Sequence, residues 1–166
     1  MKGRRYRKIL VFIVLILLAL VIGTFLYGIY HPSTNRTVSG LPSEYGTKKM
    51  SDKAMKKYVN KKVNASQVTM EVYPEVNIKP DGVNGNLWIH NVPINKVGQQ
   101  ATLLDEKGIV LAETGLIKPG YQVDTIRLSR KLSKGVLKGV IIVSFYDLEK
   151  KEKVGQESIE ARIGVE

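Results

Sequence analysis

The chain has 166 residues, with 26 basic and 15 acidic side chains, a net charge of +11 and no cysteine. Without thiols it can hold no disulfide, cysteine nucleophile, cysteine-ligated zinc or iron–sulfur cluster. Residues 1–8 carry +5 and residues 31–67 carry +6, whereas residues 68–166 hold 13 basic and 13 acidic side chains. Because a nucleic-acid-binding domain carries its basic footprint on itself, we exclude nucleic acid as a partner.

Residues 9–30 form an uninterrupted apolar stretch without a charged side chain. A helix of this length spans about 33 Å, slightly more than the hydrocarbon core of a bilayer. The stretch exceeds the apolar core of a cleaved signal peptide and ends at Tyr30-His31-Pro32, without a small-residue cleavage site. The sequence therefore predicts an uncleaved transmembrane signal-anchor over residues 9–30.

The flanking charges predict the orientation of this anchor. Residues 1–8 contain five basic side chains and no acid, and fewer basic residues follow the apolar stretch closely. The positive-inside rule then places the basic tail of residues 1–8 in the cytoplasm and residues 31–166 outside the cell membrane. The small-residue pairs Ala19/Gly23 and Thr24/Gly28 also suggest weak self-association of the span.

Residues 31–66 are predicted to be a basic spacer with a short helix near residues 50–63. Residues 31–47 have a Pro/Ser/Gly/Thr composition typical of flexible linkers. Ser51 can cap the helix, and apolar residues follow at helical spacing, with lysines on the remaining surface. These lysines are candidate contacts to an anionic leaflet or wall polymer, and the alternative is a solvated helix packed on the following domain. The candidate residues are Lys48, Lys49, Lys53, Lys56, Lys57, Lys61 and Lys62.

From residue 67 onward the pattern predicts β-structure. Short runs rich in Val, Ile, Thr and Tyr alternate with turn sequences, and no long helical period appears. Strands are expected near 67–73, 76–80, 86–91, 97–104, 109–113, 121–128, 137–146 and 154–165. Antiparallel strands in this number, over about 100 residues, predict an all-β, immunoglobulin-like two-sheet sandwich over residues 67–166.

Several segments of this domain share a pattern with known proteins. These segments are GNLWIHNVPINKVGQQATLLDEKG at 85–108, GLIKPGYQVDTIRL at 115–128, LSKG at 132–135, SFYD at 144–147 and VGQ at 154–156. Together they resemble a domain of small single-pass membrane proteins of Gram-positive bacteria, often carried on conjugative plasmids and related mobile elements. The resemblance covers roughly residues 68–165. It implies an extracytoplasmic β-sandwich and supplies no catalytic residue.

The domain offers little chemistry of its own. His90 is its single histidine, and the G-x-S-x-G motif of a nucleophile elbow is absent. Asp81 and Asn84, in the sequence PDGVNG, have side chains that ligate calcium in other proteins, but the same residues favour a tight turn, which we prefer. We therefore expect neither catalytic residues nor a metal site nor a cofactor.

Trp88 is the residue with two competing interpretations. Leu87 and Ile89 face one side of their strand, while Trp88 and His90 face the other. If Leu87 and Ile89 are buried, Trp88 and His90 form an outward patch for a partner, where tryptophan is enriched. If the register is reversed, Trp88 packs between the sheets, as in many sandwiches. We favour the core position.

Taken together, these features predict a membrane-anchored, extracytoplasmic interaction or scaffold module rather than an enzyme. Its expected partners are the lipid bilayer and other envelope proteins, and the resemblance points to a conjugative transfer apparatus. The alternative is an envelope enzyme or enzyme inhibitor that acts on cell-wall polymers.

Overall fold

The computed structural model describes residues 17–18, 20, 40–58 and 68–166. The chain divides into two compact units, Met1–Arg36 and Thr37–Glu166. In the first unit the described leucines at 17, 18 and 20 are helical and exposed. Among the described residues, no helix has the length and apolar character needed to cross a membrane. The predicted basic tail, the small-residue pairs and all other positions of the predicted anchor lie outside the described residues.

The second unit is built mostly of β-strands, and the eight strands predicted from the sequence are confirmed. They alternate with turns at the predicted Pro/Gly/Asp-rich sequences. The strands are β2 (Met70–Val72), β3 (Glu75–Ile78), β4 (Asn84–Asn91), β5 (Val97–Asp105), β6 (Val110–Glu113), β7 (Tyr121–Arg127), β8 (Gly135–Asp147) and β9 (Glu152–Val165). A further short strand, β1 (Lys48–Lys49), and a helix, α2 (Asp52–Lys56), precede them.

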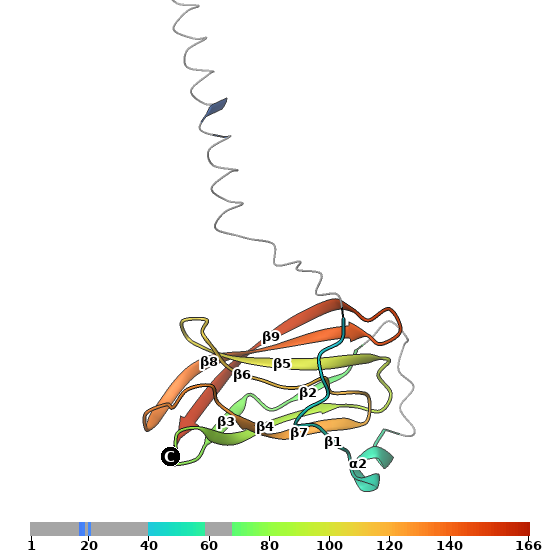
Figure 1. Cartoon of the computed structure of the whole chain (residues 1–166), viewed down its shortest axis with the longest axis horizontal. Helices are drawn as coiled ribbons and strands as arrows, with labels where there is room; N and C mark the ends of the chain where they lie inside the picture. The colour runs from blue at the N-terminus through green and yellow to red at the C-terminus, as the bar shows by residue number, and fades with distance from the viewer. Residues whose placement is uncertain (1–16, 19, 21–39, 59–67) are drawn as a thin grey trace, which may run out of the picture. The chain divides into compact units, whose positions relative to one another are not determined.

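The strands form one hydrogen-bonded path that folds into two layers (Figure 1). Its order is β1-β7-β4-β3-β9-β8-β5-β6, with β2 paired to β4 off the path. Figure 1 shows β9, β8, β5 and β6 above β3, β4 and β7. Strand β3 joins the layers, because it pairs antiparallel with β4 at Asn77↔Asn86 and parallel with β9 from Glu75↔Arg162 to Ile78↔Val165. All other pairings are antiparallel.

The main core lies between these layers. In β4, Leu87 and Ile89 are buried, and the alternate positions face outward. Ile141 of β8 and Ile163 of β9 are fully buried in the same cluster from the other layer. Burial of a Leu or Ile side chain contributes about 1.5–3 kcal/mol, so this alternation fixes the strand register.

Residues 40–50 cross the edge of the sandwich as a strap, instead of forming the flexible linker that their composition predicts. The Gly40 N–H donates to the Lys151 carbonyl (3.0 Å), and the Ser43 carbonyl accepts from the Leu116 N–H (2.8 Å). A Cβ on Gly115 would lie only 2.3 Å from the Tyr45 carbonyl oxygen, so glycine permits this close approach. The strap then pairs with β7 through β1, where Lys48 lies opposite Gln122.

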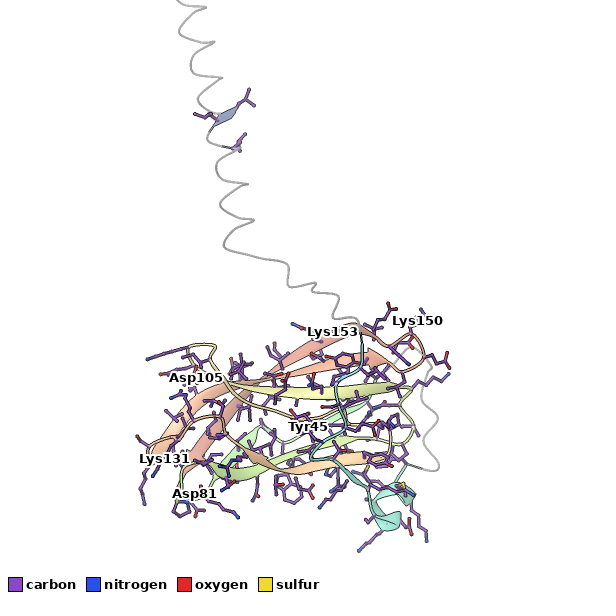
Figure 2. The ribbon with its side chains drawn as sticks, in the orientation of Figure 1. Tyr45, Asp81, Asp105, Lys131, Lys150 and Lys153 are labelled. Atoms are coloured by element: carbon purple, nitrogen blue, oxygen red, sulfur yellow. The ribbon has the colours of Figure 1, made fainter. Side chains whose placement is uncertain are left out.

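The strap and a loop also cover the outer edge of β6. The Tyr45 hydroxyl donates to the Glu113 carbonyl (3.2 Å). Ser129 covers the other end, because its N–H donates to the Leu111 carbonyl (2.7 Å) and its hydroxyl to the Val110 carbonyl (3.2 Å). Figure 2 shows Tyr45 on the strap, midway along the sandwich.

Helix α2 packs on the sandwich, as in the second of the two interpretations of the lysine-rich segment. The predicted cap is confirmed, because the Ser51 hydroxyl accepts a hydrogen bond from the Ala54 N–H (3.2 Å). Met50 and Tyr58, on either side of the helix, are buried with Val92 in a second apolar cluster. The compact unit, Thr37–Glu166, therefore includes residues that were predicted to be spacer and begins before residue 67. The predicted helical positions 59–63 lie outside the described residues.

A buried amide network holds one end of the sandwich together. Asn91, fully buried at the end of β4, donates to the carbonyls of Val97 (2.9 Å) and Ile117 (2.7 Å). Its own Oδ1 accepts from the Asn95 amide (2.7 Å). Asn95 in turn exchanges two hydrogen bonds with the Thr69 backbone, at 2.9 and 2.7 Å. The network therefore ties the start of β2, the end of β4, the start of β5 and the segment before β7.

Substitution of Asn91 tests this network. In Asn91→Ala the Val97 carbonyl loses its side-chain donor and the Asn95 amide loses an acceptor, whereas the Ile117 carbonyl keeps its bond from the Gln99 N–H. Each buried group left unsatisfied costs about 1–3 kcal/mol. We expect the free energy of unfolding in urea to fall by about 3 kcal/mol. Asn86→Ala is the matched control, because Asn86 lies on the outer side of the same strand, and it should change stability by less than about 0.5 kcal/mol. Equal effects of the two substitutions would contradict the role of the network.

Candidate functional site

Trp88 lies on the outer surface of β4, so the favoured prediction that it packs in the core is wrong. Its side chain is 41% exposed, whereas Leu87 and Ile89 on either side are 1% and 0% exposed. The pairing of β4 with β7 changes register between Asn86 and Ile89, next to Trp88. Leu87 and Ile89 fill the space between the layers, so the alternation of side chains along β4 places the Trp88 indole on the outer surface.

Trp88 does not stand alone on this surface. Tyr73 follows β2, and its N–H donates to the Trp88 carbonyl (3.1 Å). Met70 and Val72 pack against the core, so alternation directs Glu71 and Tyr73 outward. Tyr73 is 60% exposed. We call Glu71, Tyr73, Trp88 and His90 the aromatic face.

Glu71 is the electrostatic centre of this face. It lies opposite His90 in the strand pairing, with 3.7 Å between Glu71 Oε2 and His90 Nδ1. Lys57, just after α2, donates to Glu71 Oε1 (3.2 Å). Burial alone would raise the pKa of Glu71, but hydrogen bonds from Tyr58 and Lys57 and the charge of Lys57 outweigh it and lower this pKa. The face therefore has exposed aromatic rings bordered by a paired carboxylate.

His90 has an unusual environment on this face. Its side chain is 20% exposed. Its Nε2 atom is buried without a hydrogen-bond partner in the described part of the chain. Nδ1 lies toward Glu71, so the ring is oriented by the neighbouring strand β2. The 3.7 Å between His90 Nδ1 and the Glu71 carboxylate is longer than a direct hydrogen bond.

The candidate lysines fall into three groups. Lys48 forms an ion pair with Asp124, and Lys57 forms one with Glu71, so these two side chains bind the segment 48–57 to the sandwich. The side chains of Lys49, Lys53 and Lys56 are exposed. Lys61 and Lys62 lie outside the described residues. The structure thus brings Lys57 to the border of the aromatic face, a connection between the two predicted sites that the sequence did not reveal.

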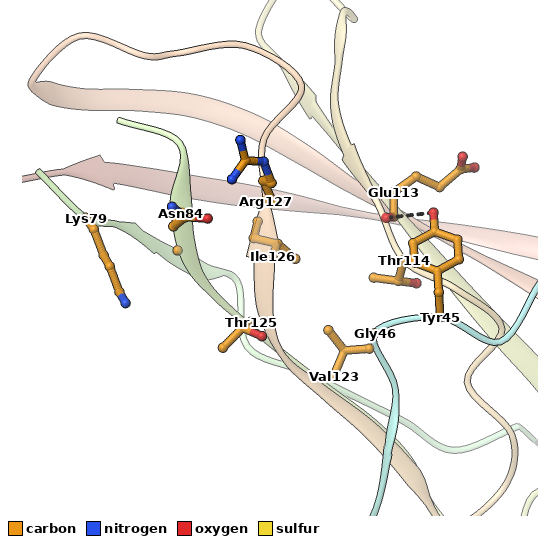
Figure 3. Close-up of a pocket in the computed structure, with 11 residues that line it drawn as sticks. Tyr45, Gly46, Lys79, Asn84, Glu113, Thr114, Val123, Thr125, Ile126 and Arg127 are labelled. Atoms are coloured by element: carbon orange, nitrogen blue, oxygen red, sulfur yellow. Dashed lines mark hydrogen bonds between the residues drawn. The ribbon is translucent and has the colours of Figure 1, made fainter. Parts of the chain in front are cut away.

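A shallow pocket of about 420 Å³ opens beside the strap (Figure 3). Tyr45 and Gly46 of the strap line one side, and Val123 and Ile126 of β7 give it an apolar floor. Figure 3 shows the Tyr45 hydroxyl directed to the Glu113 main chain. Its described lining includes Lys79, Glu113 and Arg127 and no histidine, serine or cysteine. Sequence patterns alone could not locate it, because it depends on the path of the strap.

The sequence PDGVNG forms the expected turn between β3 and β4. Asp81 Oδ1 accepts from the N–H groups of Val83 (2.8 Å) and Asn84 (2.9 Å), and Oδ2 accepts from the Asn84 amide (2.7 Å). Hydrogen bonds from Asn84 and Val83 lower the pKa of Asp81 to about 2. The carboxylate is thus occupied by its own turn. Among the described residues, no group of three or more His, Asp or Glu side chains is placed to hold a metal ion.

No protein-family model matches the chain, and no curated protein matches it. Among solved structures, it is similar to the ASH / PapD-like domain 7 of human CEP192. That match has 14% sequence identity and a TM-score of 0.37, and it covers 65% of this chain and 94% of the other.

The Asp81 turn has a predictable pH dependence. Its folded-state pKa of about 2 lies below the ordinary value of 3.8, so the stability it contributes is complete above about pH 4. This contribution should be lost as the pH falls towards 2. The difference in free energy of unfolding between the unmodified chain and Asp81→Ala should therefore narrow over that interval. Asp81→Asn, which keeps an acceptor but does not titrate, is the control, and its difference in stability from Asp81→Ala should not change with pH. A difference between the unmodified chain and Asp81→Ala that is constant with pH would contradict this assignment.

Proposed function

We propose that this chain is an interaction module that binds a protein partner through the aromatic face. The observation that carries the proposal is the exposure of Trp88 and Tyr73 side by side on the outer side of the β2–β4 pair. Tryptophan and tyrosine are enriched among the residues that dominate protein–protein binding energy, and interfaces typically have such a centre with a polar rim. The Lys57–Glu71 pair and His90 provide that rim.

The fold suits this role. We assign to it an immunoglobulin-like connectivity, with β2, β4 and β7 in one layer and β6, β5, β8 and β9 in the other. In such sandwiches one layer presents a broad outer surface while its inner side chains form the core. The aromatic face occupies the outer side of the β2–β4 pair, so its side chains are available without disturbing the core.

We further propose that residues 9–30 anchor this module in a bacterial cell membrane, with residues 31–166 outside. The support is the uncharged 22-residue stretch and the five basic side chains before it. The exposed lysines 49, 53 and 56 would then contact an anionic surface. Membership of a conjugative transfer apparatus rests on the resemblance of residues 68–165 alone.

Topology can be tested with protease on intact, wall-stripped cells. The unit of residues 37–166 should become accessible, while an epitope placed on the N-terminal tail should stay protected, because the basic tail remains in the cytoplasm. Immunoblotting with antibodies against each end gives the measurement. Protection of the C-terminal unit in intact cells, with digestion after lysis, would contradict the orientation.

The aromatic face can be tested by substitution in the full chain. The protein that co-purifies with the full chain, in mild detergent after crosslinking, should be recovered at least about tenfold less with Trp88→Ala, since loss of such a residue costs about 2 kcal/mol or more. Thermal unfolding should be nearly unchanged, because the indole is exposed.

Val154→Ala is the matched control, because Val154 is another exposed apolar side chain, at 53%, on β9. It should leave recovery unchanged. Equal recovery with Trp88→Ala and the control would overturn the assignment of the partner site to the aromatic face.

A further inference from the structure

A second surface, which shares no residue with the aromatic face, gathers positive charge. A cleft of about 550 Å³ lies between the β5–β6 turn and the loop from β7 to β8. Five cationic side chains line it, and we call it the basic cleft. They are Lys107, Arg130, Lys131, Lys134 and Lys138. Figure 2 shows Asp105 and Lys131 at one end of the sandwich, with Lys150 and Lys153 toward the other.

Two carboxylates also line the basic cleft, and one of them is already occupied. Asp105 Oδ2 accepts from Arg130 (2.6 Å), and Oδ1 accepts from the N–H groups of Lys107 and Ile109 (both 2.9 Å). Asp105 therefore neutralises Arg130 and stabilises the turn, and Glu106 is the other acid. None of the cleft lysines takes part in an ion pair among the described residues.

This arrangement separates charge within a domain of zero net charge. Residues 68–166 have equal numbers of basic and acidic side chains, but the basic cleft has five cations and two acids in its walls. The lysines at 107, 131, 134 and 138 are all exposed. A cleft lined by one sign of charge focuses the electrostatic field and concentrates counter-ions.

The remaining lining narrows the class of ligand. Ile109 and Val136, which are 51% and 62% exposed, provide aliphatic surface on the cleft. Its described lining contains no aromatic side chain on which a nucleic-acid base would stack. The cations are spread along the cleft over two loops and the start of β8, which suits a row of negative charges better than one ion.

We propose that the basic cleft binds a linear, non-aromatic polyanion, such as a phosphodiester polymer of aliphatic units. Its anionic groups would contact the four lysines, and its carbon units would lie against Ile109 and Val136. This binding is separate from the partner site on the aromatic face, because the two surfaces share no residue.

The test titrates the full chain, in neutral detergent, with short-chain inorganic polyphosphate. The unmodified chain should bind polyphosphate with an affinity that falls steeply with salt. Orthophosphate should bind far more weakly, since a single phosphate can contact only some of the cleft cations. Lys131→Gln/Lys134→Gln/Lys138→Gln should weaken polyphosphate binding about tenfold or more. It should also reduce the slope of log affinity against log salt by about 2, for three lost contacts.

A charge-matched triple variant is the control. It replaces Lys150, Lys151 and Lys153 of the β8–β9 hairpin with Gln. It should keep the full affinity, and thermal unfolding of both triple variants should match that of the unmodified chain. Equal losses in the two variants would overturn the assignment to the basic cleft.

Two further probes separate the possible sources of phosphate. Water-soluble dihexanoyl phosphatidylglycerol reports a lipid headgroup, and a single-stranded oligonucleotide reports nucleic acid. Polyphosphate that binds more tightly than either probe supports the proposal. Tighter binding of the lipid would assign the cleft to a membrane surface, and tighter binding of the oligonucleotide would assign it to nucleic acid. Either result would overturn the proposal.

Discussion

The side-chain amide of Asn91 is buried where separate segments of main chain meet, and the position of the aromatic face depends on it. Through Asn95 it holds Thr69, immediately before β2. Strand β2 has three residues, and it carries Glu71 and directs Tyr73 towards Trp88. Such a short strand gains little stability from its own hydrogen bonds to β4. The network, in which the side-chain amides of Asn91 and Asn95 are hydrogen-bonded, keeps it in register. A solvent-facing site is thus fixed by a buried amide behind it.

The two proposed surfaces use charge in opposite ways. At the aromatic face the carboxylate of Glu71 is paired with Lys57, so little net field extends from it. Binding there would rely on the apolar area of the rings and on shape. In the basic cleft the lysines are not paired with acids among the described residues, so long-range attraction dominates. The first surface suits a selective protein partner, and the second suits a ligand recognised by its charge density.

Strands and turns could be predicted from the sequence because their causes are local. The strand expected near residues 154–165 and the Asp81 turn depend on neighbouring residues, and both are found in the structure. The side on which Trp88 lies depends on which layer covers β4, so alternation alone left two registers open. The strap was missed for a similar reason. Its composition resembles that of a linker, but its main chain at Tyr45 packs closely against Gly115, about 70 residues further along the chain. The pairing of Lys57 with Glu71 is likewise set by the packing of α2, which no spacing rule predicts.

The covering of strand β6 has a consequence for how copies of this domain behave when crowded. An uncovered strand at the end of a sheet is a template on which another chain can add a strand. Here the carbonyls of Val110, Leu111 and Glu113 are already bonded, to Ser129 and to Tyr45. Edge-to-edge growth at this strand would have to break those bonds first. Neighbouring copies concentrated on one surface can therefore stay separate folded units instead of joining into a continuous sheet.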